Sequence, residues 1–501
     1  MKVPEWAQKQ RTAHSRATVL MEISNPTDSS SGLFADRDHL PQTDLYRHIG
    51  LSGAVLLVIG NVIGSGIFLT SGVMLQRMPS DSLLILAWIV GGVLALAGAL
   101  TYAEMGAMFP RSGGLYLFLH EAYGPLPAFL FGWASLLVIL TGQIGAIAIG
   151  FSEYFSYFFP YFASSHILFR IPLAGSHAVV FTANKLAASL AILFLGAVNY
   201  VNARSSNHLN AALTIIKIVG ICTLPVLAVC FSKAHPLWTP VIPAGMTGAA
   251  SAFGVAMIAV LWAYDGWQYV PFAAGEIQNP QKNIPRALGV GVTLVVIIFV
   301  AVNLAYLHAL TTEQMRGMIR VGEGSATALA GPMAGRLVSA AVLTSTFGCC
   351  AAMMLVCTRL FFAMGRKGVF PRSIGRIHTK YGTPHVAILL TTVWAVLYAL
   401  SGSYEQLFTY VIFSGLVFAV LGGVALFVLR RKLPGHLRPY RVLGYPVVPC
   451  IFIAGTCLLV FNTLVEKPLE SFAGLGLILF GLPAYWYWHG FSGDKKNTLG
   501  G

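Results

Sequence analysis

Charged residues are scarce in this 501-residue chain: they make up 10% of the sequence, whereas hydrophobic residues make up 56%. Soluble domains carry about 25% charged residues, which their water-facing surfaces require. A chain of this length in water would form several domains, each with such a surface. The composition therefore excludes a soluble enzyme, a disordered chain and a collagen-like fibre, and it indicates a protein whose outer surface faces lipid.

Cysteine and metal-ligand patterns are also sparse. The 7 cysteines are an odd number, all lie inside apolar runs, and none has C-x-x-C spacing. None of the 13 histidines belongs to a metal-ligand motif such as H-E-x-x-H. The sequence therefore predicts no disulfide framework, metal site, cofactor or catalytic centre, and we interpret the cysteines as small buried apolar side chains.

Twelve apolar runs follow one another after residue 48, and each is long enough to cross a bilayer as a helix. They lie at about 51–76, 82–108, 126–157, 179–201, 208–232, 248–275, 286–310, 334–364, 384–402, 405–430, 446–465 and 471–489. The sequence therefore predicts an all-α integral membrane protein with twelve transmembrane helices.

The two ends of the chain are polar. Residues 1–48 lack the apolar core of a cleavable signal peptide, and we interpret them as a disordered cytosolic tail, with 491–501 as a second one. Twelve crossings place both ends on one side, and most of the 32 lysines and arginines fall in loops on that side. Basic residues concentrate on the cytosolic face. The formal net charge of +14 therefore indicates a multi-pass protein of the cell membrane with both termini cytoplasmic, and no nucleic-acid partner is expected.

The first and sixth spans contain helix-breaking residues at membrane depth. The first carries a glycine-rich stretch at 60–66, which indicates either an unwound segment or close packing of small residues between helices. The sixth places Asp265 beside Gly266, and an ionisable group in a span usually faces a cavity or a partner. Two interrupted helices five spans apart indicate a transporter with inverted repeats.

The repeats fall at about 51–232 and 248–430, with extra helices at 446–489, inside a transporter domain of residues 49–490. Free N–H groups at the start of a half-helix suit a carboxylate. Free C=O groups before a break suit an ammonium group. An α-amino acid carries both, so it fits a pair of broken helices.

Several motifs occur in one order along the chain after residue 48. They are Gly60 to Phe68, Tyr102 to Gly106, Pro110 to Gly114, Trp262 to Trp267, Gly275 to Pro280, Lys282 to Arg286, Thr358 to Met364 and Tyr381 to His385. In this set the chain resembles the amino acid–polyamine–organocation superfamily, specifically its L-type amino acid transporter branch and the bacterial serine/threonine exchanger-like relatives.

The resemblance implies a LeuT-type fold of ten core helices in a 5+5 inverted repeat, with helices 1 and 6 discontinuous and two extra helices. It implies sodium-independent transport, usually exchange. It assigns the substrate carboxylate to the backbone of Ile63, Gly64, Ser65 and Gly66, and the substrate amino group to the backbone carbonyls of Trp262, Ala263 and Asp265. It also assigns the role of a gate over the site to Trp262.

Lys217 lies in the fifth span between apolar neighbours, too deep to reach water easily. In related transporters with this lysine, the ammonium group stands near the place where sodium sits in sodium-coupled relatives. The resemblance therefore implies that Lys217 substitutes for sodium. The alternative is a lysine paired with an acid for structural reasons.

Asp265 could bind a cationic side chain of the substrate, or it could cap backbone N–H groups of the unwound turn. We favour the structural role, because related sequences with neutral substrates also have an acid here. The core of the third span, 131–150, has no basic residue to balance an anionic side chain. Its small residues Gly142, Gly145 and Ala146 would leave room for a substrate, or they serve ordinary packing between helices. We therefore expect an exchanger of small to medium neutral L-amino acids that works by alternating access. The alternatives are a proton-coupled importer and an exchanger that accepts cationic amino acids.

Partners other than substrate and lipid are not expected. Eukaryotic members of the branch pair through a cysteine in the loop after the third span, and here that loop, 160–177, has none. No disulfide-linked heavy subunit is therefore expected. Two other classes of protein fit the sequence less well. A membrane enzyme would need a nucleophile–base pair or a cofactor motif, and none is predicted. A nutrient sensor would usually add a folded soluble domain, whereas both polar ends are interpreted as disordered tails.

Two carboxylates near the inner ends of helices, Glu104 and Glu276, are expected to form ion pairs. The basic residues nearest to them in sequence are Arg111, Lys282 and Arg286.

Overall fold

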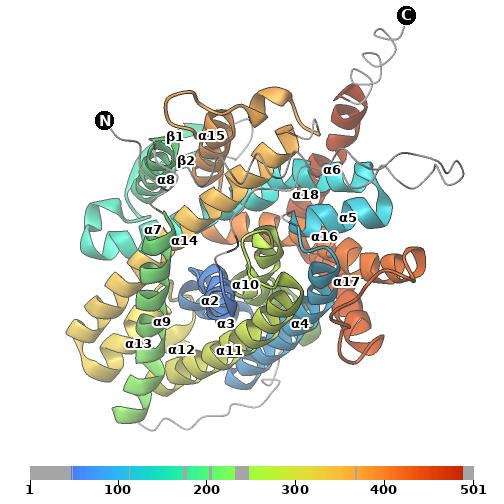
Figure 1. Cartoon of the computed structure of the whole chain (residues 1–501). Coiled ribbons are helices and arrows are strands. Elements are labelled where there is room, and N and C mark those ends of the chain that lie inside the picture. Colours follow the sequence, from blue (N-terminus) through green and yellow to red (C-terminus); the bar gives the residue numbers. More distant parts are fainter. Residues whose placement is uncertain are drawn as a thin grey trace, which may run out of the picture. The chain divides into compact units, whose positions relative to one another are not determined.

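The computed structural model describes residues 47, 49–111, 113–172, 178–201, 206–231, 248–366 and 369–488 (Figure 1). The α-helices are α2 (Leu51–Val62), α3 (Gly66–Arg77), α4 (Asp81–Met108), α5 (Gly114–Tyr123), α6 (Pro125–Ala134), α7 (Leu140–Phe158), α8 (Ala183–Val201), α9 (Ser206–Cys230), α10 (Ala249–Tyr264), α11 (Pro280–Ala309), α12 (Thr312–Met315), α13 (Val321–Ala330), α14 (Pro332–Arg366), α15 (His385–Ser401), α16 (Tyr404–Lys432), α17 (Val447–Glu466) and α18 (Pro468–Leu479). Shorter elements are the π-helical turn η1 (Ser135–Ile139), the 3-10 helices η2 (Pro160–Phe162), η3 (Trp267–Ala273) and η4 (Arg372–Gly375), and the strands β1 (Ile167–Pro172) and β2 (Ala178–Thr182).

Ten of the described helical segments are long and apolar enough to cross a membrane. They are Leu51–Arg77, Asp81–Met108, Pro125–Phe158, Ala183–Val201, Ala249–Ala273, Pro280–Ala309, Pro332–Arg366, Tyr404–Lys432, Val447–Glu466 and Pro468–Trp488. Two shorter apolar helices, Ile215–Cys230 and His385–Ser401, coincide with the fifth and ninth predicted spans. The described chain is therefore a helical, multi-pass membrane protein. The expected tails, 1–48 and 491–501, lie outside the described residues apart from Arg47.

Burial of the apolar helices falls from the middle of the bundle to its edge. In Pro125–Phe158, 89% of an apolar 18-residue stretch is buried, whereas in Pro468–Trp488 only 22% of such a stretch is buried. Lipid is as apolar as these side chains, so the outer helices need no polar face. The interrupted helices lie inside: α2 packs against α9, α11 and α14, and α10 packs against α3, α4 and α16 (Figure 1).

The start of α16 is fixed by a capping box. The Ser403 hydroxyl accepts from the Gln406 N–H, and the Gln406 side chain accepts from the Ser403 N–H. Two of the N–H groups that a helix start leaves without partners are satisfied in this way. Tyr404 and Glu405, which matter below, therefore stand on a well-defined first turn.

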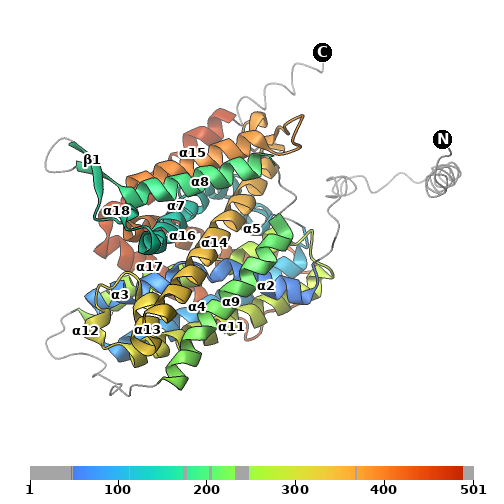
Figure 2. The ribbon, with the colours of Figure 1, turned by 90° about the vertical axis from the view of Figure 1, so that its left-hand side faces the viewer.

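One part of the all-α prediction is wrong. Strands β1 and β2 form an antiparallel hairpin (Figure 2). Phe169 pairs with Phe181 across it, and their rings stack with centroids 4.4 Å apart. Both segments are short and rich in β-branched and aromatic residues, which pack well across strands. The fourth helix therefore begins at Ala183, after the strand, and not at 179. A short apolar run can continue as helix or strand, and periodicity does not separate the two.

Candidate functional site

The first interrupted helix divides at Ile63, Gly64 and Ser65. Helix α2 ends at Val62, Ile63 has an extended backbone with ψ 92°, and α3 begins at Gly66. A methyl group at Gly66 would lie 2.6 Å from the Ala263 Cα, so only glycine fits this contact. The glycine-rich stretch predicted as an unwound segment is therefore interrupted in the structure, and its last residue packs against the other broken helix.

The second interrupted helix divides at Asp265 and Gly266. Helix α10 ends at Tyr264, Asp265 is extended with ψ 144°, and Gly266 has φ 128°, a conformation that favours glycine. A methyl group at Gly266 would lie 2.5 Å from the carbonyl oxygen of Asn61. The two breaks thus meet at both Gly66 and Gly266, and they bring four half-helix ends to one place.

Lys217 reaches the end of the first half-helix. Its Nζ donates a 2.8 Å hydrogen bond to the carbonyl oxygen of Gly60, and its side chain is buried. Gly60 lies in the last turn of α2, where carbonyl groups lack intrahelical partners and the helix dipole is negative. The Lys217 ammonium group therefore satisfies an otherwise unpaired carbonyl next to the break. Cys349 of α14 also lies at the break, with its Sγ beside Gly64.

Amide side chains hold Asp265. Gln143 of α7 donates through Nε2 to Oδ2 at 2.6 Å, and Gln268 donates through Nε2 to Oδ1. Gln268 also accepts from the Gly266 N–H at 3.1 Å, while the Tyr269 hydroxyl donates to Gln143 Oε1 at 2.9 Å. Both carboxylate oxygens therefore have neutral donors, and the network fixes the shape of the unwound turn.

Aromatic side chains cover the breaks on one side. The Trp262 indole Nε1–H donates to the Tyr404 hydroxyl at 2.7 Å, and that hydroxyl lies 2.9 Å from the Ser65 Oγ. The Trp262 ring also stacks on Phe408, with centroids 6.0 Å apart and an interplanar angle of 23°. One hydroxyl on α16 therefore joins the two interrupted helices. We refer to Ser65, Trp262, Tyr404 and Phe408 as the aromatic lid.

A family model described as amino acid permease matches residues 49–482. The chain belongs to the amino acid permease family. Over 454 residues it is 31% identical to the serine/threonine exchanger SteT of Bacillus subtilis, with 89% of this chain and 98% of that protein covered. It is also 31% identical over 457 residues to the human large neutral amino acids transporter small subunit 2, with coverages of 89% and 81%.

A third relative is the human cystine/glutamate transporter, which is 30% identical over 447 residues, with 89% of this chain and 86% of that protein covered. Membership of the family makes this protein an amino acid transporter of the membrane. The resemblance on which the sequence prediction rests is confirmed by these matches.

Two further ion-pair sites of this permease join residues far apart in sequence. Glu104 is fully buried and receives two hydrogen bonds from Arg430, at 2.9 and 2.6 Å, and another from the Val442 N–H at 2.7 Å. Arg438 stands 3.6 Å from the same carboxylate. Glu276 pairs with Arg359 of α14 at 3.1 Å. These partners differ from the basic residues nearest in sequence, which are Arg111, Lys282 and Arg286.

Several residues that shape the site are missed by sequence reasoning. Gln143 is a single amide in the apolar third span, and the rarity of polar groups at that depth is the signal that could have identified it. Tyr404 and Phe408 carry no such signal, since aromatic residues are ordinary in spans. The two glycines expected to leave room for substrate are closely packed instead: a methyl group would lie 2.8 Å from Val411 at Gly142 and 3.0 Å from Tyr398 at Gly145.

The described residues contain no cluster of three or more His, Cys, Asp or Glu side chains that could bind a metal ion.

Proposed function

We propose that this permease is a sodium-independent exchanger of small to medium neutral L-amino acids that works by alternating access. The observation that carries the proposal is the meeting of the two breaks, with Lys217 bonded to the end of one of them. Four half-helix ends at one point offer both N–H and C=O groups to a ligand. A zwitterionic α-amino acid group uses both kinds.

The proposed substrate contacts follow from the direction of each half-helix. The backbone of Ile63, Gly64, Ser65 and Gly66 precedes and begins α3, whose positive end favours the substrate carboxylate. The backbone carbonyls of Trp262, Ala263 and Asp265 end α10 and accept hydrogen bonds from the substrate ammonium group. Trp262, held by Tyr404, is the gate that separates the site from one side of the membrane.

Lys217 supplies the positive charge that a sodium ion supplies in a sodium-coupled transporter. Its ammonium group is covalently part of the chain and already binds a carbonyl oxygen at the break. A sodium ion next to it would meet like-charge repulsion in a medium of low dielectric constant. Transport therefore needs no external sodium.

A neutral substrate side chain is favoured by the hydrogen bonding of Asp265. Gln143 and Gln268 already donate to its two oxygens, and a guanidinium or ammonium group would have to share or displace them. The names of two relatives, a serine/threonine exchanger and a transporter of large neutral amino acids, support neutral substrates for this chain.

The membrane topology that we propose has twelve spans, with inverted repeats at about 51–232 and 248–430 and extra helices at 446–489, all within a transporter domain of 49–490. The charge distribution supports cytoplasmic termini at the cell membrane. The absence of a cysteine from 160–177 supports transport without a disulfide-linked heavy subunit.

Proteoliposomes test the proposed exchange. Vesicles loaded with unlabelled L-serine should take up radiolabelled L-serine much faster than empty vesicles, with or without a pH gradient. If empty vesicles accumulate L-serine when a pH gradient is applied, the protein is a proton-coupled importer and the proposal of exchange is wrong. A screen of the twenty amino acids against loaded vesicles then defines the substrate range.

A second candidate is an exchanger that accepts cationic amino acids. Asp265 lines a cavity with several aromatic residues, including Tyr102, Tyr264 and Trp267, and a cation fits a carboxylate among aromatic faces. The variant Asp265→Asn separates the two candidates. Cationic exchange requires the charge and should lose arginine uptake, whereas a structural carboxylate leaves arginine excluded in both proteins.

A further inference from the structure

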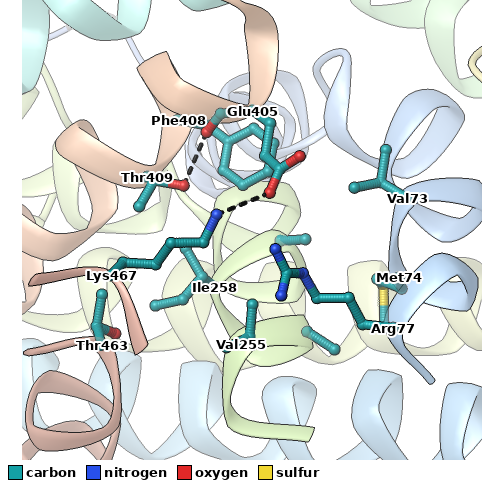
Figure 3. A pocket seen from close by; sticks show the side chains of 12 residues that line it. Val73, Met74, Arg77, Val255, Ile258, Glu405, Phe408, Thr409, Thr463 and Lys467 are labelled. Atoms are coloured by element: carbon teal, nitrogen blue, oxygen red, sulfur yellow. Dashed lines mark hydrogen bonds and ion pairs between the residues drawn. The ribbon is translucent and has the colours of Figure 1, made fainter. Parts of the chain in front are cut away.

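A second charged pocket lies beyond the aromatic lid. It is lined by residues of α3, α10, α16 and α17 and by Lys467 between α17 and α18. Its walls include the apolar side chains of Val73, Met74, Val255 and Ile258 (Figure 3). Phe408 also lines it, and the same Phe408 stacks on Trp262 over the two breaks. The pocket is therefore next to the gate, on the side that the proposed topology makes external.

Three charged side chains converge in this pocket. Figure 3 shows the Arg77 guanidinium, the Glu405 carboxylate and the Lys467 ammonium group pointing into the same space from three elements. Lys467 Nζ lies 3.2 Å from Glu405 Oε1 and donates a hydrogen bond to it. Among the ion pairs of the described residues, none includes Arg77. The pocket thus has one positive charge more than it has carboxylates.

The two threonines of the pocket are already engaged. Thr409 donates to the Glu405 carbonyl oxygen, and Thr463 donates to the Leu459 carbonyl oxygen. A polar ligand would therefore find its partners in Arg77, Glu405 and Lys467.

We propose that this pocket is a docking site for the zwitterionic group of an amino acid before it passes the aromatic lid. The Arg77 guanidinium binds the α-carboxylate, since its planar fork matches a carboxylate with two parallel hydrogen bonds. The α-ammonium group binds Glu405 and displaces Lys467 from it. A simple anion would use Arg77 alone and leave Glu405 with Lys467. The proposal rests on the proposed function of amino acid exchange.

The geometry makes Arg77 and Lys467 unequal, although each contributes one positive charge. Arg77 is the group left for the ligand carboxylate, whereas Lys467 competes with the ligand ammonium group for Glu405. Mere attraction of anions into the pocket would depend on both charges alike. Removal of each charge in turn therefore separates docking from non-specific steering.

Homo-exchange of radiolabelled L-serine in oriented proteoliposomes tests the proposal. In homo-exchange, the half-saturation constant for external L-serine and that for internal L-serine are measured separately. We expect Arg77→Gln to raise the external constant about tenfold, the size of effect for the loss of one charge-assisted pair. The internal constant and the maximal rate should stay within twofold of wild type. The matched control, Lys467→Gln, should leave the external constant unchanged or lower it.

Three results overturn the docking site: no change in Arg77→Gln, an equal rise on both faces, or an equal external rise in Lys467→Gln. A wild-type protein that exchanges no amino acid overturns the proposed function, and the docking site with it. That failure is distinguishable because it occurs in the wild type and not only in the Arg77 variant.

Discussion

The ammonium group of Lys217 lies 2.8 Å from the carbonyl oxygen of Gly60 and donates a hydrogen bond to it. The bond joins α9 to the last turn of α2, just before the chain unwinds. The positive charge stands at the negative end of a half-helix, where it stabilises both the unpaired carbonyl and the dipole. We infer that the first break depends on this lysine.

Replacement of Lys217 should therefore stop exchange without preventing folding. Lys217→Met keeps an unbranched side chain of similar length but loses a charge-assisted hydrogen bond, which contributes about 1.5–3 kcal/mol. We expect the exchange rate to fall at least tenfold in a protein that still elutes as a single species from a sizing column.

The control for this prediction is Lys185→Met. Lys185 of α8 also donates to backbone carbonyls, those of Val180 and Leu400, but it does not touch either break. The Lys185→Met variant should therefore retain exchange. Equal loss in both variants would indicate a general role in stability for lysines that bind backbone carbonyls.

The Tyr404 hydroxyl should set how well the aromatic lid closes. In Tyr404→Phe the ring remains, but Ser65 and Trp262 lose their shared partner, and a buried indole N–H is left unpaired at a cost of about 1–3 kcal/mol. We expect the ratio of exchange rate to half-saturation constant to fall by about five- to tenfold. Tyr410→Phe on the same helix is the control and should behave as wild type. If this ratio is unchanged in Tyr404→Phe, the Tyr404 hydroxyl has no role in the gate.

Gly266 should tolerate no side chain. In Gly266→Ala the new methyl group would lie 2.5 Å from the Asn61 carbonyl oxygen, and φ 128° is unfavourable for alanine. The breaks must then separate, so we expect both a lower melting temperature and loss of exchange. Gly476→Ala is the control, because nothing lies within 4 Å of a methyl group there and alanine favours a helix. Full exchange in Gly266→Ala would show that the contact between the breaks is dispensable.

The buried carboxylate of Glu104 should contribute strongly to stability. Glu104→Gln removes the charge that pairs with Arg430 from a side chain that has no exposed surface, and breaking such a buried pair costs about 3–5 kcal/mol. We expect a lower melting temperature in detergent. Glu313→Gln removes an exposed pair with Arg316 and should change the melting temperature little, since exposed pairs contribute about 0–1 kcal/mol. Equal melting temperatures of the two variants would contradict this role of Glu104.

The positions of the two breaks could be predicted from sequence, because glycine clusters and an acid at membrane depth are costly and therefore informative. The burial of Lys217 could be predicted for the same reason. The partners of Glu104 and Glu276 could not, since Arg430 and Arg359 reach them only through helix packing. Tyr404 is an ordinary aromatic residue in sequence, and its role arises from where α16 begins. The hairpin was missed because short apolar runs fit either a strand or a helix.

The measurement that tests the account most directly is L-serine exchange by the wild-type protein with sodium on both faces, and again with choline in its place. If the Lys217 ammonium group supplies the charge at the first break, the two initial rates should be equal. Exchange that requires sodium would contradict the account, because a second cation would then be needed beside Lys217.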